Sequence, residues 1–223
     1  MPHGRNRNHV GFFGRNKKIA LYPFSWINRP KERVTQEEVS HVQRSYAQTR
    51  RYSYDHKSVR GGAFFLLPTE LINEIITYWL ARAKCRYGRG LHIYGYLFLS
   101  NHFHLFCKDT EGTLAEFMEY FQGNVARAIN RAIGRGPAHF WQGHYDDQIV
   151  DGEKAFWNKY VYIMTNAVKS GLVKRVEDWA GVNSFKAAIT GEPIRGAGLN
   201  RTRYHNANRG NKKRPKSDFM ETY

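Results

Sequence analysis

The stretch that decides the fold is Leu91-His-Ile-Tyr-Gly-Tyr-Leu-Phe-Leu-Ser-Asn101, which runs directly into His102-Phe103-His104. Its aromatic and branched residues predict a strand, a turn at Ser100-Asn101 and a second strand from His102 to Lys108. Side chains at i and i+2 leave one face of a strand, so both imidazoles point one way. Two neutral imidazoles about 7 Å apart along a strand can share one divalent ion. The pair is therefore a candidate metal site, with two ordinary histidines at a strand end as the alternative.

The spacing of apolar residues predicts three helices. The first is capped by Thr69 and stops before Gly88, the second covers 113–133 and the third covers 153–169. Further strands are predicted at 61–67 and 140–150. Strands that alternate with helices across short links indicate an α+β fold, with one antiparallel sheet and helices on one face.

The charge balance favours a polyanionic partner. The 223 residues include 35 Lys and Arg against 19 Asp and Glu, a formal net charge of +16, and 15% of them are aromatic. Cationic surfaces attract phosphates, and exposed rings stack on unpaired bases. Composition therefore indicates nucleic acid, and an RNA-binding protein shares both features.

Polar, basic segments flank the predicted core. Residues 1–60 form a basic N-terminal extension, 61–190 the core domain, and 191–223 a basic tail that we expect to be mobile without a ligand. The tail carries Lys212, Lys213 and Arg214 as candidate phosphate contacts. Two cysteines outside any CxxC pair and the lack of a long apolar run favour a cytoplasmic protein with no membrane contact.

A second constellation lies in Tyr160-Val-Tyr-Ile-Met-Thr-Asn-Ala-Val-Lys-Ser-Gly-Leu-Val173. In a helix, Tyr162 and Asn166 stand one turn apart and Lys169 continues their face, whereas Tyr160 points about 200° away. A tyrosine hydroxyl is a competent nucleophile toward phosphorus when a cation stabilises the developing charge. A packed helix with a surface tyrosine is the simpler interpretation of this segment alone.

Three motifs, in their order along the chain, resemble those of the REP-associated, IS200-like branch of the single-tyrosine HUH transposases. Leu99-Ser-Asn-His-Phe-His-Leu105 resembles their Met-Pro-Asn-His-Val-His-Leu signature, and Phe140-Trp-Gln-Gly-His144 resembles their Trp-Gln-Gly-Arg segment. The segment 162–173 resembles Tyr-Ile-x-x-Asn-Pro-Val-Arg-Ala-Gly-Leu-Val. The resemblance covers roughly residues 62–186, so neither extension takes part in it.

The resemblance implies a ferredoxin-like catalytic domain. His102 and His104 would be metal ligands, Asn166 the third ligand and Tyr162 the nucleophile, with Mg²⁺ or Mn²⁺ as the ion. The reaction would be cleavage and transfer of single-stranded DNA at hairpin-forming ends, through a 5′-phosphotyrosine. Ser100 and Ala167 replace prolines of the pattern, and Lys169 keeps a positive charge where the pattern has Arg.

Other interpretations stay open. A non-catalytic protein that binds hairpin DNA or RNA, such as a domesticated transposase, would share the charge and the aromatic residues. A zinc site needs no tyrosine and would use four histidines, His92, His102, His104 and His144. Arg127 and Arg131, one helical turn apart, are candidate contacts to DNA phosphates, and so is Lys169. The sequence is also compatible with a homodimer.

Overall fold

The computed structural model describes residues 52–210 and 213–223. Four antiparallel strands form its main sheet, in the spatial order β2-β3-β1-β4. They are β1 (Tyr52–Ser58), β2 (Leu91–Phe98), β3 (His102–Asp109) and β4 (Asp146–Val150). With α2 (Glu70–Tyr87) between β1 and β2, and α3 (Leu114–Ala132) between β3 and β4, the chain follows the βαββαβ order of a ferredoxin-like fold.

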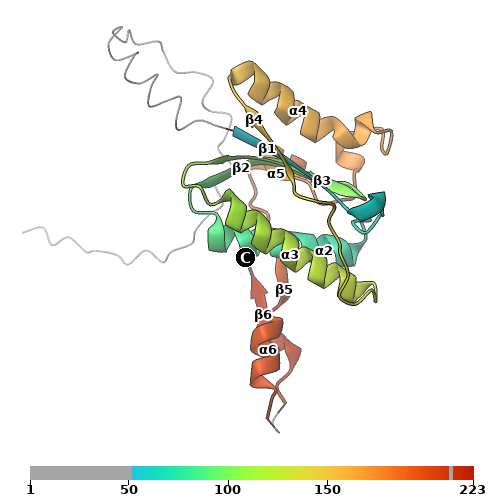
Figure 1. Ribbon diagram of the computed structural model, residues 1–223, viewed down its shortest axis with the longest axis vertical. Helices are drawn as coiled ribbons and strands as arrows, with labels where there is room; N and C mark the ends of the chain where they lie inside the picture. Colours follow the sequence, from blue (N-terminus) through green and yellow to red (C-terminus); the bar gives the residue numbers. More distant parts are fainter. Residues whose placement is uncertain (1–51, 211–212) are drawn as a thin grey trace, which may run out of the picture.

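Helices α2 and α3 cover one face of the sheet, and α4 (Glu153–Lys169) covers the other (Figure 1). Phe103 and Leu105 of β3 belong to the core that α2 and α3 close. Phe106 of β3 belongs to a second, smaller core that Ile163 and Ala167 of α4 complete. The predicted α+β fold and antiparallel sheet are confirmed, but the prediction that all helices lie on one face is wrong, because α4 takes the opposite face.

The predicted helices agree closely with the structure. The Thr69 side chain accepts a hydrogen bond from the Ile72 backbone N–H, as an N-cap residue does. Helix α3 begins one residue later than predicted, and α4 has the predicted bounds. Regular apolar spacing explains this success, because each helix buries a single stripe.

The predicted first strand is wrong. Residues 60–62 form a short 3₁₀ helix, η2 (Arg60–Gly62), and 63–69 are irregular. The sheet instead begins at β1, inside the segment that we predicted to be an extension. β1 lies between β3 and β4, pairing His56 with His104 on one side and with Asp146 on the other. Residues 1–51, the rest of the predicted extension, lie outside the described residues. The predicted strand at 140–150 contains β4 only in its second half, since Gly143 takes a positive φ of 56°.

The C-terminal segment is folded, which corrects the expectation of a mobile tail. β5 (Ala197–Leu199) pairs with β6 (Met220–Thr222), and α6 (Arg201–Ala207) and η4 (Lys216–Phe219) lie between them. We call residues 195–210 and 213–223 the C-terminal arm, which projects from the α2 side of the domain (Figure 1). A Cβ atom at Gly196 would lie 2.5 Å from the Thr77 carbonyl oxygen, so glycine permits the close approach of the arm to α2.

Salt bridges also attach the C-terminal arm. Glu221 contacts Arg82 of α2 at 3.6 Å and Arg203 of the arm at 3.3 Å. In the part of the chain that the structure describes, no helix is long and apolar enough to cross a membrane.

The central position of β1 can be tested with a proline at Ser53, whose neighbours across the sheet are Cys107 and Ile149. Ser53→Pro removes a ladder hydrogen bond from a strand paired on both sides and leaves a carbonyl without its donor, so we expect a loss of about 1–3 kcal/mol in the free energy of unfolding. Ser53→Ala, which keeps the backbone N–H, is the control and should lose less. Equal stability of the two variants in urea unfolding would place 52–58 outside the sheet.

Candidate active site

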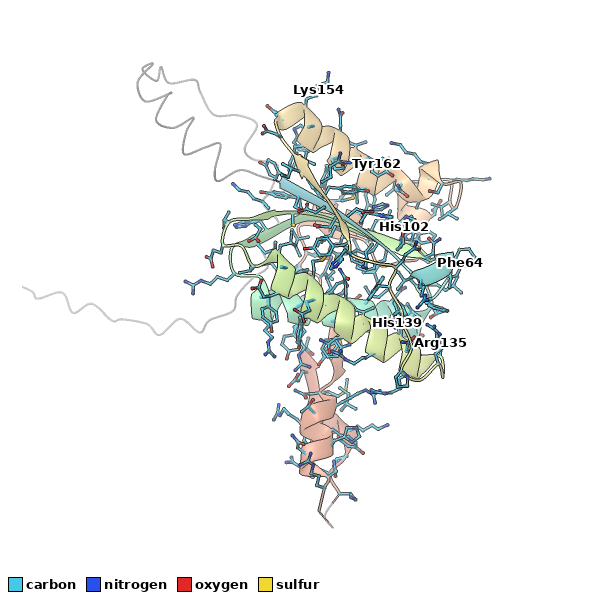
Figure 2. The ribbon with its side chains drawn as sticks, viewed as in Figure 1. Phe64, His102, Arg135, His139, Lys154 and Tyr162 are labelled. Atoms are coloured by element: carbon cyan, nitrogen blue, oxygen red, sulfur yellow. The ribbon has the colours of Figure 1, made fainter. Side chains whose placement is uncertain are left out.

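The face of the sheet beneath α4 holds a cavity of about 460 Å³. The cavity is lined by side chains of β1, of its two neighbours β3 and β4, and of α4. The lining residues are Tyr54, His56, His102, His104, Asp146, Gln148 and Tyr162. Figure 2 shows His102 at the end of the sheet, beneath the helix that carries Tyr162. The structure thus brings the histidine pair and the candidate nucleophile to one site.

The two predicted histidines do point to one side of β3, and a third histidine joins them. The ring centroids of His102 and His104 are 4.9 Å apart, and His56 of β1 lies 5.0 Å from His102 and 5.1 Å from His104. His56 reaches this position because it pairs directly with His104 across the β1–β3 ladder. Its other neighbour is Asp146, whose carboxylate lies 3.6 Å from His56 Nδ1.

Burial keeps both predicted ligands neutral. Desolvation, followed by the charge of His56, lowers the pKa of His102 to about 4. Desolvation, followed by the charges of His102, His56 and Lys159, lowers the pKa of His104 to about 3. At neutral pH each imidazole therefore has one nitrogen lone pair available, as a metal ligand requires.

Hydrogen bonds at one ring nitrogen leave the other available. His102 Nδ1 is 2.7 Å from Asn101 Oδ1, and His104 Nδ1 is 2.6 Å from the Tyr54 hydroxyl. His104 Nε2 is buried and has no hydrogen-bond partner among the described residues. Ligating histidines characteristically bind the ion through one nitrogen while the other is held by a polar partner. The pair therefore fits a divalent ion.

A third ligand is not evident from the side chains in place. Asn166 is buried, accepts a hydrogen bond from the Ser170 hydroxyl and does not line the cavity. Within residues 52–210 and 213–223, no group of three or more His, Cys, Asp or Glu side chains is arranged to hold a metal ion. The four-histidine zinc site is wrong, because His92 pairs with Lys108 at the far end of β3 and neither His92 nor His144 lines the cavity.

Tyr162 is exposed on α4. Its side chain is 37% exposed, and its ring lies 5.9 Å from that of His104. The ammonium groups of Lys159 and Lys169 lie 5.6 and 5.3 Å from its ring centroid. Tyr160 instead stacks on Phe156 within the core beneath α4, so the two tyrosines occupy different environments, as the helical spacing predicts.

The remaining predicted DNA contacts lie away from the cavity. Arg127 and Arg131 are exposed on α3, across the sheet, where Arg127 donates a hydrogen bond to Asn124. Lys213 and Arg214 lie in the C-terminal arm, where Lys213 donates to the Asn208 carbonyl and Arg214 pairs with Asp218. Lys212 is outside the described residues.

Sequence reasoning missed Tyr54, His56 and Gln148. Aromatic rings at 52, 54 and 56 alternate with Ser53, Asp55 and Lys57, which is the period of a strand. This alternation does not read as a buried strand because Ser53, Asp55 and Lys57 are polar, although all three are buried in the structure.

The fold is shared with a transposase of known structure. A REP-associated tyrosine transposase bound to a REP hairpin matches with a TM-score of 0.50 and 21% identity, over 65% of this chain and 83% of that chain. The chain has the fold of this transposase. A candidate transposase from Deinococcus radiodurans R1 matches at 15% identity, over 50% of this chain and 89% of that one, with a TM-score of 0.37. No protein-family model and no curated protein matches. The fold implied by the sequence motifs is thereby confirmed.

The lowered histidine pKa values predict a particular pH dependence of stability. Between about pH 6.5 and 4, the unfolded chain binds protons that folded His102 and His104 do not, so stability falls as the pH falls through this window. From pH 7 to pH 5, the chain should lose about 2–4 kcal/mol more than the variant His102→Gln/His104→Gln, up to about 2 kcal/mol for each histidine.

Urea unfolding of both proteins at the two pH values measures this difference. The comparison with the double variant is needed because burial, followed by the Asp147 charge, raises the pKa of Asp55 to about 7. The titration of Asp55 makes stability rise as the pH falls. This contribution is the same in both proteins, so it cancels from the comparison. An identical loss in both would show that the imidazoles titrate normally.

Proposed function

We propose that this protein is a metal-dependent DNA strand transferase, transposase-like in its chemistry, that acts on single-stranded DNA at hairpin-forming ends. The observation that carries the proposal is the placement of the exposed Tyr162 across one cavity from two neutral histidines, the buried His104 and the half-buried His102. The shared transposase fold supports it, as does the net charge of +16.

The nucleophile would be the Tyr162 hydroxyl oxygen. The hydroxyl gives up its proton as its oxygen forms a bond to the phosphorus of the scissile phosphodiester. The bond from phosphorus to the 3′-oxygen breaks, and that oxygen takes up a proton, so no proton is gained or lost overall. The products are a 5′-phosphotyrosine and a free 3′-hydroxyl. Since each phosphodiester is exchanged for another, the reverse attack by a new 3′-hydroxyl joins strands without a nucleotide cofactor.

Mg²⁺ or Mn²⁺, when bound, would polarise the phosphoryl oxygen and neutralise developing charge. His102 and His104 would hold the ion through their available nitrogens. Asn166 stays a proposed third ligand, and to serve it must release Ser170 and turn toward the cavity. Lys159 and Lys169, beside the Tyr162 ring, would attract the phosphate to the nucleophile.

The nucleophile is tested by incubating the protein with single-stranded hairpin DNA and Mn²⁺ and resolving covalent adducts on a denaturing gel. We expect an adduct with the unchanged chain and none with Tyr162→Phe, which lacks the attacking oxygen. Tyr160→Phe is the matched control and should retain the adduct, because Tyr160 packs in the core beneath α4. Tight, metal-independent hairpin binding without an adduct would favour the non-catalytic binding protein.

The C-terminal arm is proposed to add phosphate contacts. Arg201, Arg209 and Lys216 are exposed on it. Cations that contact phosphates displace counterions, so each contributes about one unit to the slope of log affinity against log salt. The variant Arg201→Gln/Arg209→Gln/Lys216→Gln should lower the slope for hairpin binding by about two to three units, with the adduct yield at saturating DNA unchanged.

A charge-matched control removes three cations that are each paired with a glutamate elsewhere: Arg89→Gln/Arg175→Gln/Lys186→Gln. This control should change the slope little. If both triple variants change it equally, the effect comes from net charge and the arm has no contact of its own with DNA.

A further inference from the structure

Tyr54 of β1 connects the histidine pair to the candidate nucleophile. Its hydroxyl lies 2.6 Å from His104 Nδ1, and its ring stacks on that imidazole with centroids 5.5 Å apart at 18°. On its other side, its ring meets the Tyr162 ring edge-on at 6.2 Å and 80°. The Lys159 ammonium lies 3.9 Å above the Tyr54 ring centroid. The side chain is thus held on three sides.

The direction of the first hydrogen bond follows from the surroundings of the two His104 ring nitrogens. One ring nitrogen, Nδ1, lies at the Tyr54 hydroxyl, and the other, Nε2, is buried. A hydrogen on Nε2 would leave a buried N–H without an acceptor among the described residues, which costs more than a buried lone pair does. The hydrogen therefore belongs on Nδ1, which donates to the Tyr54 oxygen. This leaves Nε2 available for an ion and the proton of Tyr54 available for another acceptor.

The candidate for that acceptor is the Tyr162 hydroxyl oxygen, because the two rings meet edge-on at 6.2 Å and both side chains line the same cavity. Gln148, which also lines the cavity, accepts a hydrogen bond from Lys159 through its Oε1 atom. The chain of donors therefore runs from His104 through Tyr54 to Tyr162.

We propose that Tyr54 is a positioning residue, which donates a hydrogen bond to Tyr162 Oη and stabilises negative charge on that oxygen. The inference rests on the function proposed above. In strand joining, a 3′-hydroxyl attacks phosphorus, the bond from phosphorus to Tyr162 Oη breaks, and the tyrosine oxygen leaves with the electron pair before it takes a proton. A donor already in place at this oxygen stabilises the transition state without rearrangement.

The test compares Tyr54→Phe with the unchanged chain. The phenyl ring keeps the stacking on His104 and the contact with Lys159, and loses only the hydroxyl. Tyr52→Phe is the matched control, because Tyr52 lies two residues earlier on the same strand and packs on Phe106 and Phe156. Hairpin affinity and the single-turnover rates of adduct formation and strand joining are measured with Mn²⁺.

We expect Tyr54→Phe to bind the hairpin within about twofold of the unchanged chain and to slow strand joining by about 10–100-fold, since removal of one preorganised donor costs up to about 10²–10³-fold. Tyr52→Phe should keep both rates. A joining rate equal to that of the unchanged chain would overturn the inference, as would a loss of hairpin affinity large enough to account for the slower reaction.

A second measurement separates charge stabilisation from a merely structural effect. Replacing Tyr162 by 3-fluorotyrosine makes position 162 a better leaving group. It should therefore accelerate joining more in the Tyr54→Phe background than in the unchanged chain. Equal acceleration in both backgrounds would overturn the role of Tyr54 in stabilising charge. If the unchanged chain forms no adduct at all, the proposed function fails together with this inference, whereas an active chain that is indifferent to Tyr54→Phe refutes the inference alone.

Discussion

The register of the β1–β3 ladder is the constraint on which the rest of the structure depends. It pairs His56 with His104 and Tyr54 with Phe106, and so fixes which side chains face α4. A slip of one residue would turn Phe103 and Leu105 out of the main core and His104 into it. Because Phe103 is fully buried against Phe98, Phe121 and Trp141, that slip would expose a large apolar area. The packing of one face therefore positions the chemical groups of the other.

The site is buried at the sheet and exposed at helix α4. His104 is 2% exposed at the floor, whereas Tyr162 is 37% exposed on the helix above it. Burial keeps the imidazole neutral, while exposure leaves the tyrosine accessible to a large substrate. Tyr54 lies between the two and contacts both. Such an arrangement separates the groups that would hold an ion from the group that would meet the DNA strand.

The sequence was most informative where a buried stripe or strand is regular. α3, α4 and the β2–β3 pair could all be predicted because their apolar residues recur with one period. β1 could not, because the side chains on its core face are Ser53, Asp55 and Lys57. These polar groups are accommodated by long-range contacts, such as that of Lys57 with the Gly143 carbonyl and that of the Ser53 hydroxyl with Asp147. No pattern in the neighbouring sequence predicts partners so far away along the chain.

The C-terminal arm and Asn166 show the same limit. The arm is stabilised by Glu221 bonding to Arg82 and by glycines that let it approach Tyr78, so its order depends on α2 and not on its own composition. Helical spacing correctly placed Asn166 one turn from Tyr162. It could not show that the amide faces Ser170 and lies outside the cavity, because rotamers depend on neighbours in space.

The most direct test of the central claim, that Tyr162 is the group that attacks DNA, is peptide mapping of the covalent adduct by mass spectrometry. Trypsin cleaves after Lys159 and Lys169, which gives one peptide, 160–169, that contains both Tyr160 and Tyr162. We expect a phosphonucleotide on this peptide, with fragment ions that place it on Tyr162. A nucleotide on Tyr160, on Tyr54 or on any other residue would contradict it.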